Sequence, residues 1–210
     1  MTIRPIIFSG PMIRALLEGR KTQTRRVLSN MDGVKEVRRP DRATWDFVYP
    51  KGYKNPKASP PNYAVGDLLY VRESFALSET GFAFMADHPG DTSGMGWKPS
   101  IHMPREASRL TLKVTDVRVQ RVQETTQDDV LAEGAPIDPD YRDTTQDLSA
   151  PPMIKTGVAQ WQSPRAWFHR LWDSLNEKRG YGWNKNPWVI ALTFEVHHCN
   201  VDQFNREVAA

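Results

Sequence analysis

Two stretches of alternating apolar residues constrain the fold of this chain most. The stretch 188–196 alternates throughout and places its apolar residues on one face of a strand: Trp188, Ile190, Leu192, Phe194 and Val196. The stretch 110–119 alternates from Leu110 to Val114 and then slips in phase to Val117, which predicts a bulge or bend near Asp116. A small barrel needs such a bend to close, so the pattern favours a curved β-sheet.

Shorter segments add further strands and three helices. We expect helices over 11–18, 126–133 and 164–178, because each follows a Ser or Thr that can cap it and runs toward a glycine that can end it. We expect short strands at 3–8, 22–28, 34–37, 45–49, 68–71, 75–77 and 82–85. The predicted fold class is therefore α+β, with a mixed β-barrel and flanking helices.

Length and composition favour one soluble domain. With 210 residues, of which 39% are hydrophobic and 25% charged, we expect a single domain over 1–210 with polar insertions at about 29–64 and 135–162. No apolar run is long enough to span a membrane and the start lacks a signal peptide, which predicts a cytoplasmic protein without a membrane partner. The lone Cys199 excludes an internal disulfide.

Neither a metal nor a cofactor is expected. His197, His198 and Cys199 are adjacent, but on a strand His198 points away from the other two, so at most two ligands converge. An exposed strand end is the better interpretation of these residues. The sequence therefore predicts no metal site and no cofactor.

Charge is unevenly distributed, although the net charge is only +3. Residues 1–42 carry ten basic against four acidic side chains, and residues 123–149 carry eight acidic side chains and only Arg142 as a base. A basic half is typical of attraction to phosphate, and an acidic segment suits the opposite wall of a cleft. Two solvated faces would give the same pattern, and charge alone favours that simpler interpretation.

The segment 19–26, with the sequence GRKTQTRR, concentrates polar chemistry where a helix passes into a strand. Thr24 and Arg26 would point to one side of the strand and Arg25 to the other, with Lys21 at the corner. Three neighbouring guanidinium groups disfavour the ammonium form of Lys21, and burial would lower its pKa further, so it can serve as a base toward a hydroxyl. The alternative is a basic surface turn that binds phosphate or nothing.

The segment 19–26, followed by Gly66-Asp67 and then Glu133-Gly134, resembles the ASCH domain of the PUA-like β-barrel superfamily. The resemblance extends over almost the whole chain outside the two insertions. Val71–Phe75, Trp97–Arg105 and Asn186–Trp188 are similar to a branch common in phages and prophages. The resemblance implies a PUA-like fold that binds RNA or modified nucleobases.

One branch of that family hydrolyses the acetyl amide on the exocyclic amine of acetylcytidine with a lysine, a threonine and a glutamate. By resemblance these roles fall on Lys21, Thr24 and Glu133. Many ASCH domains carry glutamate at the position of Thr24, so the threonine favours the hydrolase branch. A glutamate that merely completes a helix end is the alternative for Glu133.

A second set of residues is predicted to bind the substrate or single-stranded RNA: Arg20, Arg25, Arg26, Glu73, Trp97, His102 and Arg105. Arginines suit phosphate, and a tryptophan with a histidine suits a flipped-out base. The expected partner is a modified nucleoside or single-stranded RNA, with phage DNA a weaker third. We expect the basic segment and the Trp97–Arg105 loop to border one cleft. The alternative to the hydrolase is a non-catalytic module that binds RNA or a modified base.

Overall fold

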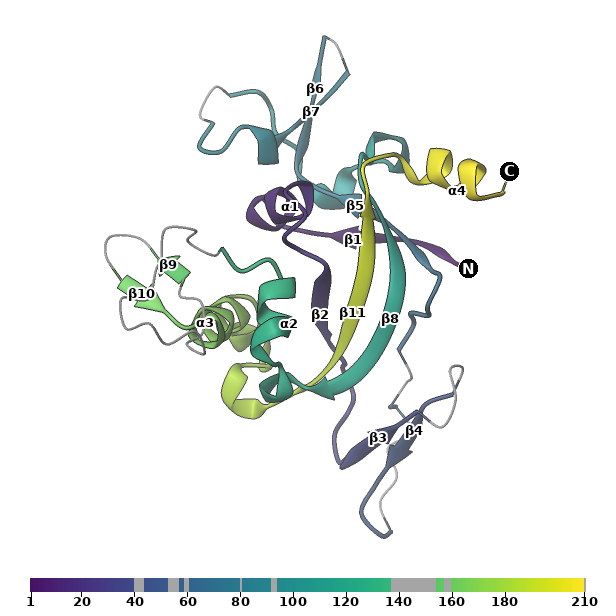
Figure 1. Ribbon diagram of the computed structural model, residues 1–210, viewed down its shortest axis with the longest axis vertical. Coiled ribbons are helices and arrows are strands. Elements are labelled where there is room, and N and C mark those ends of the chain that lie inside the picture. The colour runs from purple at the N-terminus through teal and green to yellow at the C-terminus, as the bar shows by residue number, and fades with distance from the viewer. Residues whose placement is uncertain are drawn as a thin grey trace, which may run out of the picture. The chain divides into compact units, whose positions relative to one another are not determined.

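The structure is a computed structural model that describes residues 1–39, 44–52, 57–58, 61–79, 81–91, 94–136, 154–156 and 160–209. Its described residues form a sheet in the strand order β1, β5, β8, β11, β2, with bounds Ile3–Ile7, Leu68–Arg72, Thr111–Arg121, Trp188–His197 and Gln23–Val27 (Figure 1). The pairing is parallel between β1 and β5 and antiparallel between β5 and β8. The mixed α and β composition agrees with the predicted α+β class.

Within the described residues β1 and β2 are edge strands, and the sheet does not close into a barrel. The finer expectation of a PUA-like barrel is therefore not confirmed. The predicted change of phase does occur in β8, where Val114 and Val117 are both buried although they are three residues apart. The strand nevertheless continues through Asp116 without interruption.

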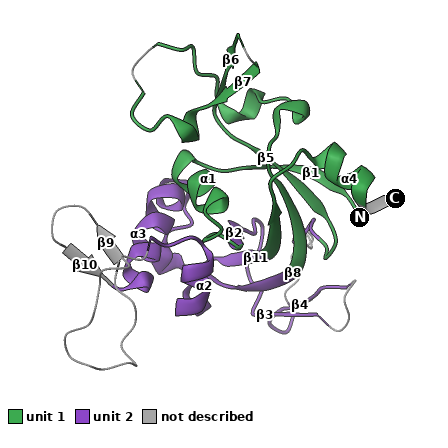
Figure 2. Cartoon of the chain, turned by 45° about the horizontal axis from the view of Figure 1, so that its top comes forward, with its two compact units in different colours: residues 1–22, 64–116, 193–210 green, residues 23–63, 117–192 purple. Residues whose placement is uncertain are grey.

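The chain divides into two compact units (Figure 2). Unit 1 comprises residues 1–22, 64–116 and 193–210, and unit 2 comprises residues 23–63 and 117–192. Two of the boundaries between the units fall inside β8 and β11, so both long strands contribute to both units. Each unit is thus assembled from segments far apart in sequence.

In unit 1, helix α1 (Gly10–Leu17) follows β1 and begins after Ser9, with Pro11 in its first turn, as expected. Its residues Ile13 and Leu16 are fully buried. The hairpin of β6 (Phe75–Ser78) and β7 (Gly81–Phe84) also agrees with the sequence.

Helix α4 (Val201–Ala209) was not predicted from the sequence. Its residues Val201 and Phe204 pack against Leu68 of β5. The segment is short and mostly polar, so its helical state depends on this packing rather than on a strong local pattern.

In unit 2, helices α2 (Gln127–Ala132) and α3 (Pro164–Asn176) have the predicted caps. The Thr126 hydroxyl accepts a hydrogen bond from Asp129 N, and the Ser163 hydroxyl accepts one from Ala166 N. Phe168 and Trp172 belong to the apolar stripe of α3 and are buried in one core cluster with Val130 of α2 and Trp183. Helix α3 ends two residues earlier than expected and continues as a 3-10 turn, η5, over Glu177–Arg179.

The expected insertion at 29–64 belongs to unit 2 as far as residue 63, and it contains the hairpin of β3 (Glu36–Arg38) and β4 (Asp46–Val48). Its residues Met31 and Val34 are buried against Trp188, and the Trp188 indole donates a hydrogen bond to Val34 O at 3.1 Å. In the expected insertion at 135–162, the short strands are β9 (Ile154–Thr156) and β10 (Gln160–Gln162), while 137–153 and 157–159 lie outside the described residues.

Candidate functional site

Lys21 is buried in unit 1 at the end of the turn that follows α1. Gly19 takes the left-handed conformation (φ 73°) that glycine adopts without steric cost, and Lys21 N then donates a hydrogen bond to Ala15 O at 3.0 Å. The residue is only 1% exposed, and its Nζ lies 5.5 Å from the centroid of the Phe8 ring. Lysine is almost never this buried without a specific partner, so Lys21 is not part of an ordinary surface turn.

Strand β2 of unit 2 carries three of the predicted residues in succession. Thr24 is 2% exposed, Arg25 is 4% exposed and Arg26 is partly buried. Successive side chains of a strand point to opposite faces, so β2 is covered on both faces at this point. The alternation expected from the sequence thus does not separate a buried from an exposed side here.

Arg25 holds Glu133 in a buried ion pair within unit 2. Its Nη1 donates to Glu133 Oε1 at 3.0 Å, and its Nη2 lies 2.9 Å from Asp129 Oδ2. Glu133 is the C-cap residue of α2 and is 5% exposed. The structure therefore brings together Arg25 and Glu133, which the sequence had assigned to different roles.

Asp129 completes this cluster, and Arg118 of β8 donates to its Oδ1 at 2.8 Å. Burial by itself raises the pKa of Asp129. The Arg118 hydrogen bond and the charge of Arg25 outweigh that effect and lower the pKa to about 2. Asp129 is thus a fixed negative charge that shares Arg25 with Glu133.

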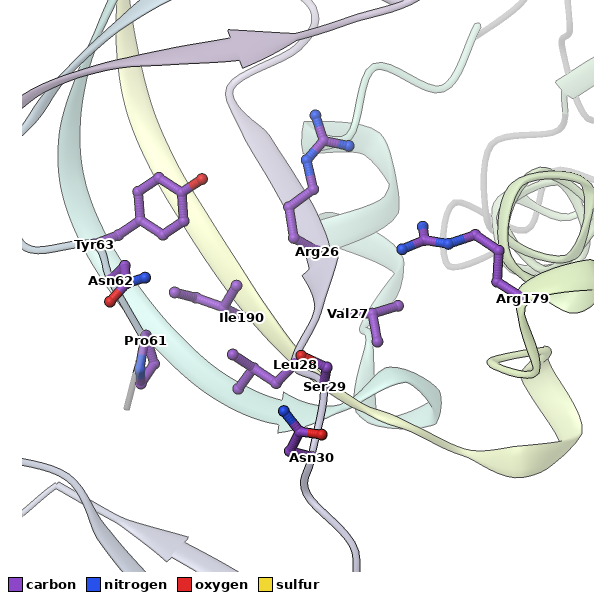
Figure 3. A pocket seen from close by; sticks show the side chains of 10 residues that line it. All are labelled: Arg26, Val27, Leu28, Ser29, Asn30, Pro61, Asn62, Tyr63, Arg179 and Ile190. Carbon is purple, nitrogen blue, oxygen red and sulfur yellow. The ribbon is translucent and has the colours of Figure 1, made fainter. Parts of the chain in front are cut away.

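Arg26 lines a pocket of about 460 Å³ in unit 2 (Figure 3). The other lining residues come from the end of β2 and its continuation, from the end of the insertion, from η5 and from β11: Val27, Leu28, Ser29, Asn30, Pro61, Asn62, Tyr63, Arg179 and Ile190. Burial and the positive charge of Arg179 lower the pKa of Arg26, although Glu133 and Tyr63 oppose this. The pocket is therefore an electropositive concavity with an aromatic ring on its wall.

Glu73 lies in unit 1 and is paired with Arg109. The Arg109 guanidinium donates two hydrogen bonds to the Glu73 carboxylate, at 2.9 and 3.0 Å, and also binds Asp87. Its Cζ lies 4.1 Å from the centroid of the Phe84 ring. Burial raises the pKa of Glu73 despite the arginine. Glu73, which was predicted to bind the substrate or RNA, is thus paired with an arginine of its own unit.

The remaining predicted binding residues are engaged within unit 1. The Trp97 indole donates to Asp91 at 2.8 Å, and Arg105 forms a two-bond pair with Asp202. Arg20 pairs with Glu18 at the surface. His102 is exposed and lines a pocket of about 480 Å³ with Phe75 and Phe82. That the basic segment and this loop border one cleft stays a prediction.

Sequence reasoning missed four residues of unit 2 that shape the site: Arg118, Asp129, Tyr63 and Arg179. Asp129 was visible only as an acid in the first turn of a helix, which suits the helix dipole without any partner. Tyr63 lies at the end of a polar insertion and Arg179 at a helix end, so neither belongs to a pattern. Only their positions in space connect them to Arg26.

Comparisons of the chain with protein-family models, with curated proteins and with solved structures found no match. Among the residues that the structure describes, no group of three or more His, Cys, Asp or Glu side chains is arranged to hold a metal ion. Over the same residues, no helix is long and apolar enough to cross a membrane.

Proposed function

We propose that this chain is an ASCH-type domain of the PUA-like superfamily that hydrolyses the acyl amide on the exocyclic amine of acylated cytosine nucleosides. The observation that carries the proposal is the burial of the three residues assigned to catalysis. Lys21, Thr24 and Glu133 are 1%, 2% and 5% exposed, although all three are polar and two are ionisable. Buried ionisable groups are costly to stability and cluster at functional sites.

In this mechanism the Thr24 hydroxyl attacks the acyl carbonyl carbon, while neutral Lys21 accepts the hydroxyl proton. The acyl group passes to Thr24 Oγ1, and the C–N bond breaks as the departing amine receives a proton. A water molecule then hydrolyses the ester and frees Thr24. Glu133 orients the lysine or delivers the proton, and its ion pair with Arg25 would keep its carboxylate in one position.

The mechanism requires the three side chains to meet at one substrate, which is a prediction. It needs no metal and no cofactor. Cys199 is a free cysteine, which suits a reducing compartment, so we place the reaction in the cytoplasm. Arg26 would hold a phosphate or the developing oxyanion.

A second candidate function is a non-catalytic module that binds single-stranded RNA or a modified base. The pocket lined by Arg26, Arg179 and Tyr63 favours it, because guanidinium groups and an aromatic ring are sufficient for binding and neither is a nucleophile. A threonine at position 24, three residues after Lys21 in the sequence, is the feature that a pure binding module does not need.

The deciding experiment is to incubate the purified chain with acetylcytidine and to follow the release of cytidine and acetate by chromatography. The hydrolase predicts turnover that Lys21→Ala and Thr24→Ala abolish. Thr22→Ala is a matched control, because Thr22 is exposed on the same segment. Absence of turnover by the folded wild-type protein on acylated cytidines of several acyl chain lengths would contradict the hydrolase and favour the binding module.

A further inference from the structure

The pocket that Arg26 lines in unit 2 is distinct from the residues proposed for catalysis, because none of Lys21, Thr24 and Glu133 is among its lining residues. Its floor is apolar, with Leu28 and Ile190, and Figure 3 shows Tyr63 on one side of Ile190 and both arginines on the other. Its volume of about 460 Å³ falls within the range of roughly 300 to 1,000 Å³ that is usual for small-molecule sites. It has room for a ligand of nucleotide size.

Two guanidinium groups line this pocket, and none of its lining residues in the described part of the chain carries a carboxylate. Arg26 comes from β2 and Arg179 from η5; burial lowers the pKa of Arg26, and the positive charge of Arg179 adds to that effect in the same direction. Arg179 is exposed, and its Nη1 donates a long hydrogen bond of 3.3 Å to Asn176 Oδ1. Two like charges facing one concavity repel each other, and a bound anion relieves that repulsion.

Glu133 is the carboxylate whose charge raises the pKa of Arg26, but Arg25 also binds Glu133, at 3.0 Å. The negative charge of Glu133 therefore acts on both Arg25 and Arg26. Arginine pairs bind phosphate oxygens through several charge-assisted hydrogen bonds, which matches the planar geometry of guanidinium to a tetrahedral anion.

The other wall suits a nucleobase. Tyr63 is partly buried and presents a ring, while Asn30 and Asn62 add amide groups at the rim. Asn30 adopts a left-handed backbone conformation (φ 60°), which asparagine tolerates better than most residues and which turns the chain at the pocket edge. An aromatic face with amide donors and acceptors is a common way to hold an unpaired base.

We propose that this pocket is a nucleotide subsite, in which Arg26 and Arg179 bind a phosphate and Tyr63 stacks against a nucleobase. The inference goes beyond the proposed hydrolysis, because Arg179 and Tyr63 have no part in that reaction, and it deepens the second candidate function by naming the residues that would bind the phosphate and the base. The insertion supplies Asn62 and Tyr63, so it takes part in binding. The phosphate belongs either to a free nucleotide or to single-stranded RNA.

Equilibrium binding to the full chain tests this subsite. Isothermal titration would compare cytidine, cytidine 5′-monophosphate and a short oligouridine, each at low and moderate salt. We expect the phosphorylated ligands to bind about tenfold or more tightly than cytidine, since charged hydrogen bonds typically contribute this much or more. Tight binding of the monophosphate assigns a free nucleotide, and tight binding of oligouridine alone assigns RNA.

Variants identify the pocket as the site. Arg179→Ala should remove most of the preference for phosphate, and Tyr63→Ala should weaken all base-containing ligands about tenfold. Arg170→Ala is the matched control, because Arg170 is exposed on α3 in the same unit and does not line the pocket. Equal affinity for cytidine and its monophosphate, or equal losses in Arg170→Ala and Arg179→Ala, would overturn the subsite. Neither result depends on whether acetylcytidine is hydrolysed.

Discussion

Arg25 and Glu133 are 108 residues apart in the chain, and their side chains form a buried ion pair with Nη1 and Oε1 3.0 Å apart. Both side chains are nearly inaccessible, at 1% and 6% exposed. A second carboxylate, Asp129, lies 2.9 Å from the same guanidinium. One arginine therefore compensates two buried charges and joins β2 to helix α2, whose C-cap residue is Glu133.

The first prediction is that Arg25→Ala destabilises the protein severely. The substitution leaves two buried carboxylates without Arg25, and loss of one partner of a buried pair typically costs about 3 to 5 kcal/mol. Urea unfolding monitored by circular dichroism measures the loss. Arg38→Ala is the control, because Arg38 pairs with Glu36 at the surface and should cost less than about 1 kcal/mol. Similar costs for the two variants would contradict a stabilising role for the buried cluster.

The second prediction concerns acid. Asp129 has a folded-state pKa of about 2, below its ordinary 3.8, so the unfolded chain binds this proton more readily than the folded chain. The ionised Asp129 therefore contributes about 2 kcal/mol to the free energy of unfolding above about pH 4, and this contribution is lost as the pH falls toward 2.

Unfolding measured from pH 7 to pH 2 tests the role of Asp129. Asp129→Asn should flatten the acid limb of the stability curve, whereas Asp128→Asn, at an exposed position on the same helix, should leave it unchanged. An acid limb that is identical in the two variants would show that Asp129 is not the responsible carboxylate.

The third prediction is that Arg109→Ala weakens unit 1. Without Arg109, the charge of Glu73 stays buried without this partner, and its pKa rises further above its ordinary value. Because Arg109 is itself 25% exposed, we expect a smaller loss than for Arg25, about 2 kcal/mol. Arg105→Ala, which breaks the exposed pair with Asp202, provides the comparison in thermal unfolding. The idea fails if Arg105→Ala is the more damaging of the two.

The fourth prediction separates catalysis from folding. Lys21→Ala, Thr24→Ala and Glu133→Gln should each lower kcat for acetylcytidine by a factor of about a hundred or more, since each removes a base, a nucleophile or a proton carrier. Lys35→Ala, Thr22→Ala and Glu79→Gln replace exposed residues of the same types and should keep wild-type rates. Circular dichroism at the assay temperature confirms that each variant is folded. Full activity of Lys21→Ala would eliminate the mechanism.

Local patterns in the sequence were sufficient for most helices and strands. Helix α3 and strand β11 were predicted within two residues at each end, because a capping serine, an apolar stripe and a strict alternation are all encoded by near neighbours. The change of phase between Val114 and Val117 was equally readable. Helix α4 was missed, because its state depends on the contact of Val201 and Phe204 with Leu68, far away in sequence.

The residues of the candidate site divide in the same way. The sequence by itself marked Lys21, Thr24 and Glu133 through a motif, and their burial is consistent with that selection. Only the tertiary structure pairs Arg25 with both Glu133 and Asp129. It also brings Tyr63, Arg26 and Arg179 together around one pocket. Ion pairs and pockets depend on distances between segments that are separated by tens of residues, and neither periodicity nor capping carries that information.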